Sequence, residues 1–170
     1  CARKYAAATW VDKAGDLWFF GGDGLSNGGS TGCFNDLWRY RISTNEWTWM
    51  KGSSGINQYS VYDGQGSFAA ANTPGARMET SAAWTDNDGN LWLFGGLSNN
   101  DGFYNDLWKY DVASNQWAWV GGSDQPGFTP AVYGTKGVAD PSNIPSGRSV
   151  YCHWKDKDGN FWLFGGGGAS

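Results

Sequence analysis

Few side chains in this 170-residue chain have the types and spacing that catalysis requires. The one histidine, His153, follows Cys152 in a segment that we expect to be a strand, so their side chains point to opposite faces. They therefore do not form a nucleophile and base, and one histidine cannot supply the two imidazoles of a copper centre. Glu46 and Glu79 are the only glutamates, and nothing pairs them for glycoside cleavage. We expect no catalytic residue, metal or cofactor in this segment.

Two acidic turns share part of the pattern of calcium-binding loops. The sequences DNDG, from Asp86, and DKDG, from Asp156, place carboxylates at alternate positions, as calcium loops do. The equivalent turn from Asp12 reads DKAG, however, and Leu97 stands where a calcium loop would supply its final glutamate. We expect tight hairpin turns in which Asp and Gly serve the backbone.

The elements that position these residues are predicted to be strands. The chain contains 12 Trp and 27 Gly, and no long stretch has the apolar spacing of an amphipathic helix. Aromatic residues with frequent glycine favour short strands joined by tight turns, which indicates an all-β fold. The net charge of -4 and the scattered basic residues argue against a nucleic-acid partner. No apolar run is long enough for a membrane span.

The chain is built from an internal repeat. The segment ARKYAAATWVDKAGDLWFFGG, from Ala2, realigns with ARMETSAAWTDNDGNLWLFGG, from Ala76, and with GRSVYCHWKDKDGNFWLFGG, from Gly147. A second block, FNDLWRYRISTNEWTWMKGS from Phe34, matches YNDLWKYDVASNQWAWVGGS from Tyr104. A long repeat that carries several strands is typical of a propeller or a solenoid.

Each complete unit resolves into four predicted strands. The second is apolar on both faces and ends at a glycine pair, so the second strands should be among the most buried segments. The third and fourth should form a hairpin. The predicted strands are 6–11, 17–20, 37–41 and 47–50 in the first unit, 80–85, 91–94, 107–111 and 117–120 in the second, and the second strand 161–164 in a third.

The double glycine, the NDLW-x-Y strand and the N-x-W-x-W strand, in this order, resemble kelch repeats, and more narrowly the long bacterial-type kelch units. The connectors VYDGQGSFAAANTPGAR, from Val61, and VYGTKGVADPSNIPSGR, from Val132, carry part of this likeness. The resemblance implies one kelch-type β-propeller region over 1–170. It would comprise a four-stranded blade with its connector over 1–74, a second over 75–146, and the first half of a third over 147–170. It also implies a secreted or cell-surface protein.

Half a blade leaves an unpaired strand edge and exposed apolar faces, whereas propellers typically close with about four to eight blades. We expect the missing surfaces to come either from further blades of a longer chain or from other copies of this chain. We therefore expect the unpaired edge of the strand 161–164 to be covered by another segment rather than exposed to solvent.

The tryptophans and arginines fall into predicted classes. Tryptophans of the second and third strands should form the core between blades, whereas those of the fourth strands either pack or stand exposed and stack on sugar rings. The arginines before the first strands either bond to carbonyls and carboxylates or form an anion site. The core class is Trp18, Trp38, Trp92, Trp108 and Trp162, the fourth-strand class is Trp47, Trp49, Trp117 and Trp119, and the arginines are Arg3, Arg77 and Arg148.

The two long connectors are candidate interaction loops. Their aromatic side chains either seal neighbouring blades or form a rim for a ligand or another subunit. The candidates are Tyr59, Tyr62, Phe68, Phe128 and Tyr133.

Cys1 and Cys33 are a candidate disulfide. Cys1 stands just before the first strand and Cys33 late in the loop after the second, and the start of one antiparallel strand lies near the end of the other. Two unpaired thiols are the open alternative. Cys152 falls inside a first strand and should be a buried free thiol.

These observations favour a non-catalytic structural, adhesive or protein-interaction module of an extracellular or cell-surface protein. It would contact other copies or partners through its long loops and open blade edges. The first alternative is a carbohydrate-binding propeller that uses exposed Trp and Tyr. The second is a fragment of a propeller enzyme, such as a copper radical oxidase, whose active site lies elsewhere.

Overall fold

The regular structure of this protein consists of β-strands. The computed structural model describes residues 3–5, 7–80, 82–125, 127 and 129–168, and no helix occurs among them. The prediction of an all-β chain is confirmed. The strands are β1 (Arg3–Tyr5), β2 (Ala8–Val11), β3 (Leu17–Phe20), β4 (Asp23–Leu25), β5 (Thr31–Cys33), β6 (Leu37–Arg41), β7 (Glu46–Lys51), β8 (Phe68–Ala69), β9 (Ala82–Thr85), β10 (Leu91–Ser98), β11 (Gly102–Asp111), β12 (Gln116–Gly121), β13 (Arg148–Ser149), β14 (Cys152–Lys155), β15 (Phe161–Phe164) and β16 (Gly167–Gly168).

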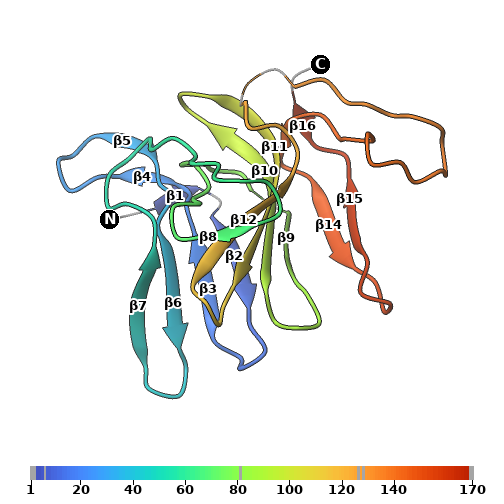
Figure 1. Cartoon of the computed structure of the whole chain (residues 1–170). Coiled ribbons are helices and arrows are strands. Elements are labelled where there is room, and N and C mark those ends of the chain that lie inside the picture. The colour runs from blue at the N-terminus through green and yellow to red at the C-terminus, as the bar shows by residue number, and fades with distance from the viewer. Residues whose placement is uncertain (1–2, 6, 81, 126, 128, 169–170) are drawn as a thin grey trace.

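Three antiparallel sheets follow one another along the chain, from the blue and teal strands to the red ones (Figure 1). The first sheet has the strand order β2-β3-β6-β7, and the second has the order β8-β12-β11-β10-β9. The third sheet pairs β14 with β15 alone. Smaller pairings, β1-β4-β5 and β13-β16, accompany the first and third sheets.

The repeat in the sequence is also a repeat in strand register. Each first strand pairs with the second so that two tryptophans face each other, and Trp38 opposes Trp49 on β6 and β7 as Trp108 opposes Trp119 on β11 and β12. Asn45 and Asn115 close these two hairpins with positive φ angles of 59° and 56°, a conformation that Asn tolerates better than most residues. The tryptophan pairs of the inner strands are Trp10–Trp18, Trp84–Trp92 and Trp154–Trp162.

The second sheet has a fifth strand that the sequence pattern does not predict. Residues 52–76 form the first connector, and β8 within it pairs with the outer strand β12, so that Trp117 lies opposite Ala69. Figure 1 shows this green strand beside β12. The chain that leaves the first sheet therefore covers the outer edge of the second.

Aromatic side chains fill the interface between the first and second sheets. Trp18 meets Tyr110 edge to face with ring centroids 5.4 Å apart, and Phe20 meets Trp117 in the same way at 5.7 Å. The indole Nε1 of Trp10 donates to a backbone carbonyl of the second sheet at 2.9 Å. Buried aromatic pairs of this kind supply much of the stabilisation of such a core.

The third sheet is much less covered, and this corrects three predictions. Phe161 and Leu163 pack on the second sheet, but Phe164 is 72% exposed and Trp162 is 49% exposed. The predictions that 161–164 is among the most buried segments and that Trp162 is a core residue are therefore wrong. Cys152 is also exposed rather than buried. The reason is shared: this sheet has two strands, and no described segment packs against its far face.

Candidate interaction surfaces

The first connector is packed down on the second sheet. The ring of Tyr62 stacks on Trp108 with centroids 5.2 Å apart and meets Trp119 edge to face at 5.1 Å. Its hydroxyl donates to Asp106 Oδ2 at 2.9 Å. Burial, and next the negative charge of Asp106, raise the pKa of Tyr62 well above its ordinary value. Tyr62 thus seals the sheet rather than forming a free rim.

The other candidate loop residues divide between solvent and edge pairing. Tyr59 and Tyr133 are largely exposed, at 68% and 82%. Phe68 belongs to β8 and remains 42% exposed although its backbone pairs with β12. Phe128 lies outside the described residues. The second connector, residues 121–147, carries Tyr133 and includes the orange loop that projects beyond the sheets at the upper right of Figure 1.

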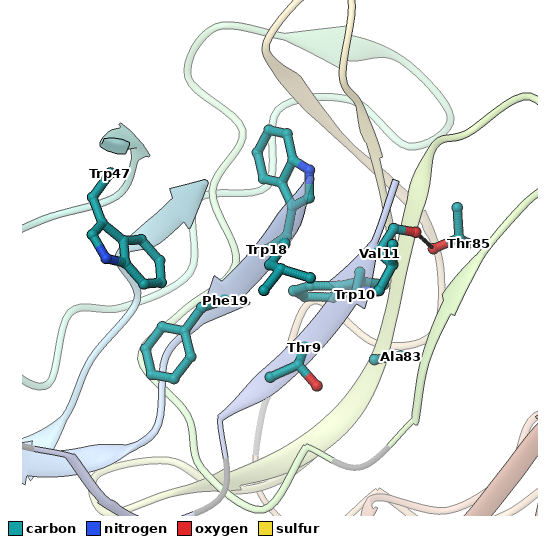
Figure 2. A pocket seen from close by; sticks show the side chains of 9 residues that line it. Thr9, Trp10, Val11, Trp18, Phe19, Trp47, Ala83 and Thr85 are labelled. Atoms are coloured by element: carbon teal, nitrogen blue, oxygen red, sulfur yellow. Dashed lines mark hydrogen bonds between the residues drawn. The ribbon is translucent and has the colours of Figure 1, made fainter. Parts of the chain in front are cut away.

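The face of the first sheet that points away from the second sheet is open and aromatic. An open cavity of about 550 Å³ lies along it and extends to Ala83 and Thr85 of β9. Figure 2 shows Trp47 and Phe19 at one end of this cavity and Val11 with Thr85 at the other. The dashed line marks the bond that Thr85 Oγ1 donates to the carbonyl of Val11 at 2.9 Å. A further cavity of about 800 Å³ lies beside Trp38, Trp47 and Trp49.

The fourth-strand tryptophans differ sharply between units. Trp47 and Trp49 of β7 are 59% and 49% exposed, whereas Trp117 of β12 is fully buried and Trp119 is half-buried. Trp18 and Trp108 are buried, as predicted for the core class, while Trp38 and Trp92 are half-buried.

The recurring arginines bond to carboxylates and backbone carbonyls. Arg77 is buried and donates to both oxygens of Asp106, at 2.6 and 2.9 Å, and to two glycine carbonyls. Burial alone would lower the pKa of Arg77, but the charge of Asp106 raises it above the ordinary value. Arg3 donates from Nη2 alone to both carboxylate oxygens of Asp36 and from Nε to the carbonyl of Gly21, and Arg148 donates to backbone carbonyls. These contacts support the structural interpretation over the anion site.

The acidic turns are hairpin turns. Asp86 accepts hydrogen bonds from two backbone N–H groups of its own turn and, at 2.9 Å, from the indole of Trp92. Burial would raise the pKa of Asp86, but these hydrogen bonds lower it below its usual range. Asp156 repeats the geometry, and the indole of Trp162 lowers its pKa to about 2. No group of three or more His, Cys, Asp or Glu in the described chain could hold a metal ion.

His153 and Cys152 occupy opposite sides of β14. The imidazole of His153 stands edge-on to Trp84 of the second sheet, with ring centroids 5.5 Å apart, and partial burial lowers its pKa. Cys33 is buried, and burial raises the pKa of its thiol. Cys1 lies outside the described residues, and so does its candidate pairing with Cys33. No helix in the described part of the chain is long and apolar enough to cross a membrane.

Comparison with known proteins gives a likeness in fold. No protein-family model and no curated protein matches the chain. Among solved structures, the chain is similar to YjhT, with a TM-score of 0.51 and 20% sequence identity. The similarity covers 74% of this chain and 40% of YjhT, so the chain spans less than half the length of that protein. At this identity the similarity concerns the fold alone.

Proposed function

We propose that this chain is a non-catalytic structural module of a secreted or cell-surface kelch protein, in which each complete unit is a four-stranded propeller blade. It acts by joining other copies of itself, or further blades, through its open end faces. Its protein-binding role therefore depends on surfaces that are already shaped for a neighbouring unit.

One observation carries the proposal: equivalent positions of the repeat are buried in one unit and exposed in another. Leu91 and Leu93 of the second sheet are buried against the first sheet, whereas their counterparts Leu17 and Phe19 line the open cavity of the first sheet. In the third sheet, Trp162 and Phe164 hold the same register positions as Trp18 and Phe20 of the first sheet. Trp162 and Phe164 are exposed, whereas Trp18 and Phe20 are buried. Large apolar patches of this kind mark interaction surfaces.

Sedimentation velocity of the full chain over a wide concentration range tests the proposal. We expect reversible association that grows with concentration and persists in high salt, because the end faces are apolar. A monomer at every concentration, with no partner domain captured by either end face, would contradict it.

Carbohydrate binding is a second candidate, favoured by the geometry of β6 and β7. The rings of Tyr40 and Trp47 have centroids 5.0 Å apart, Tyr40 half-buried and Trp47 59% exposed, beside Trp49 and the cavity of about 800 Å³. Sugar rings stack on such surfaces. A glycan array with the wild type and Trp47→Ala tests this: specific binding that the variant loses would replace self-association as the leading function. We do not propose the oxidase alternative, because it places the active site elsewhere and no observation on the described residues favours it.

A further inference from the structure

The packing of Tyr62 is a template for how a connector binds a sheet. Tyr62 contacts Trp108, Trp119 and Asp106, and other residues of the connector donate hydrogen bonds to backbone carbonyls of β12. Gly66 N donates to the carbonyl of Trp119 at 2.7 Å, and the side chain of Gln65 donates to the next carbonyl at 3.2 Å. A tyrosine, a glycine N–H and a short strand thus close one sheet edge.

The second connector has the same internal structure but covers no sheet in the described chain. Val132 and Ile144 exchange two backbone hydrogen bonds at 2.8 and 2.9 Å, as Val61 and Thr73 do in the first connector. Asn143 donates to the carbonyl of Val138 as Asn72 donates to that of Ser67. In this alignment Tyr133 takes the place of Tyr62, yet it is 82% exposed. The connector is preformed for a surface that it does not contact.

The first sheet presents the matching surface. The indole of Trp38 donates to Asp36 Oδ2 at 2.7 Å, as the indole of Trp108 donates to Asp106 Oδ2 at 2.7 Å. Trp49 stands at the register of Trp119. In the second sheet, Tyr62 packs on these indoles. The first sheet has no such tyrosine, and the indoles of Trp38 and Trp49 stack on each other with ring centroids 6.2 Å apart. β7 is an edge strand, so its outer backbone groups are available for pairing.

We infer that the second connector of one copy binds the outer edge of the first sheet of a second copy, with Tyr133 packed on Trp38 and Trp49 and bonded to Asp36. This inference rests on the proposed self-association and names the contact that produces it. The joint is head-to-tail, because the two surfaces are different and lie at opposite ends of the chain. Preformed surfaces lose little conformational entropy when they associate, which favours binding.

The joint also has a consequence for the third sheet. The first connector covers the sheet that follows it along the chain. After the second connector, β14 and β15 take the positions of the two inner strands of such a sheet. A complete first sheet from another copy fits there only if this pair moves aside. The outer face of the pair is open, with Trp154 46% and Phe164 72% exposed. Moving it aside therefore gives up contacts with the second sheet, among them the packing of Phe161 and Leu163 and the bond from Trp84 to the carbonyl of Trp154.

A mixing experiment with two variants of the full chain tests the joint. Tyr133→Ala removes the tyrosine but keeps the first-sheet surface, and Trp49→Ala does the reverse. Each variant alone should associate at least about 30-fold more weakly, the loss expected for an aromatic residue at the centre of an interface. Equimolar mixing should restore a single joint, so that the mixture forms dimers and no larger species in sedimentation velocity. Tyr59→Ala, an exposed tyrosine of the first connector, is the matched control and should associate like the wild type.

The outcomes separate the contact from the function. If both variants still associate like the wild type, self-association stands and the tyrosine joint is wrong. If the wild type is monomeric throughout, the tyrosine joint is wrong, and the proposed function fails with it only if neither end face captures a partner domain. Hydrogen exchange on the associated wild type should show new protection in β7 and residues 132–144, with faster exchange in 152–164; unchanged protection in β7 overturns the inference even if oligomers form.

Discussion

The first and second sheets have nearly the same sequence pattern and strand register but different environments. In the second sheet, the first connector pairs with the edge of the outer strand β12, and the first sheet packs on the face that carries Trp117. Trp117 is therefore fully buried. The outer strand of the first sheet has Trp47 at the same register with 59% of its surface exposed. The comparison teaches that the burial of a repeat position depends on the neighbouring unit and connector, not on its own strand. Matched substitutions in the two sheets can test this.

The largest difference is expected for the two carboxylates that bind the recurring arginines. Asp106→Asn leaves the guanidinium of Arg77 buried without its counter-charge and should reduce the free energy of unfolding by about 3 to 5 kcal/mol. Asp36→Asn should cost clearly less, because the side chains of Arg3 and Asp36 retain some contact with water. Urea unfolding measures both, and equal losses would contradict a role for burial.

The next difference concerns the fourth-strand tryptophans. Trp117→Ala should destabilise the fold by about 3 kcal/mol, the lower end of the range for a buried Trp, because its Nε1 has no hydrogen-bond partner among the described residues. Trp47→Ala should cost less than about 1 kcal/mol, since most of its surface already meets water. Thermal unfolding at a concentration where the chain is monomeric gives the comparison. A larger loss at Trp47 would mean that the first sheet is covered in solution.

A smaller effect is expected for the two connector tyrosines. Tyr62→Phe removes only the hydroxyl that donates to Asp106 and should reduce stability by about 1.5 kcal/mol, the value typical of a bond to a charged acceptor. Tyr133→Phe should leave the stability of the monomer unchanged, because that side chain is exposed. Denaturant midpoints measure both, and a shift for Tyr133→Phe would show that the second connector is packed within one chain.

The smallest effect is a pH dependence at the interface of the second and third sheets. Partial burial lowers the pKa of His153 in the folded state, so the unfolded chain binds the proton more readily. Its contribution to stability is therefore complete above the unfolded pKa of about 6.5 and is lost as the pH falls through the lower folded value. The size should be well under about 1 kcal/mol because the ring is partly exposed. The measurement is the free energy of unfolding of the wild type minus that of His153→Gln, compared between pH 7.5 and about pH 5. We expect this difference to fall toward low pH, and a difference that grows would contradict the sign.

Much of the fold could be predicted from the sequence, because strand alternation and turn residues are local signals. The hairpin of β6 and β7 and the Asp86 turn follow from such signals and are confirmed. β8 was missed because its two residues pair only through their contact with β12, which no local pattern encodes. The exposure of Phe164 was missed for the same physical reason: an apolar strand has the same sequence whether or not a neighbour covers it.

The candidate surfaces were less predictable than the strands. Tyr62 and Tyr133 occupy equivalent positions in two similar connectors, yet one is packed and the other is exposed. The signal that could have separated them is the order of units: the first connector precedes a complete sheet, and the second precedes two strands.

The position of β8 has a consequence for synthesis of the chain on the ribosome. The first connector leaves the ribosome before β11 and β12, so the segment that covers the outer edge of the second sheet is present before that edge exists. Nascent strands with unpaired edges are prone to aggregate while they wait for partners. In this chain β12 can be paired on both sides as soon as it emerges, which shortens the time for which its aromatic edge is exposed in the crowded cell.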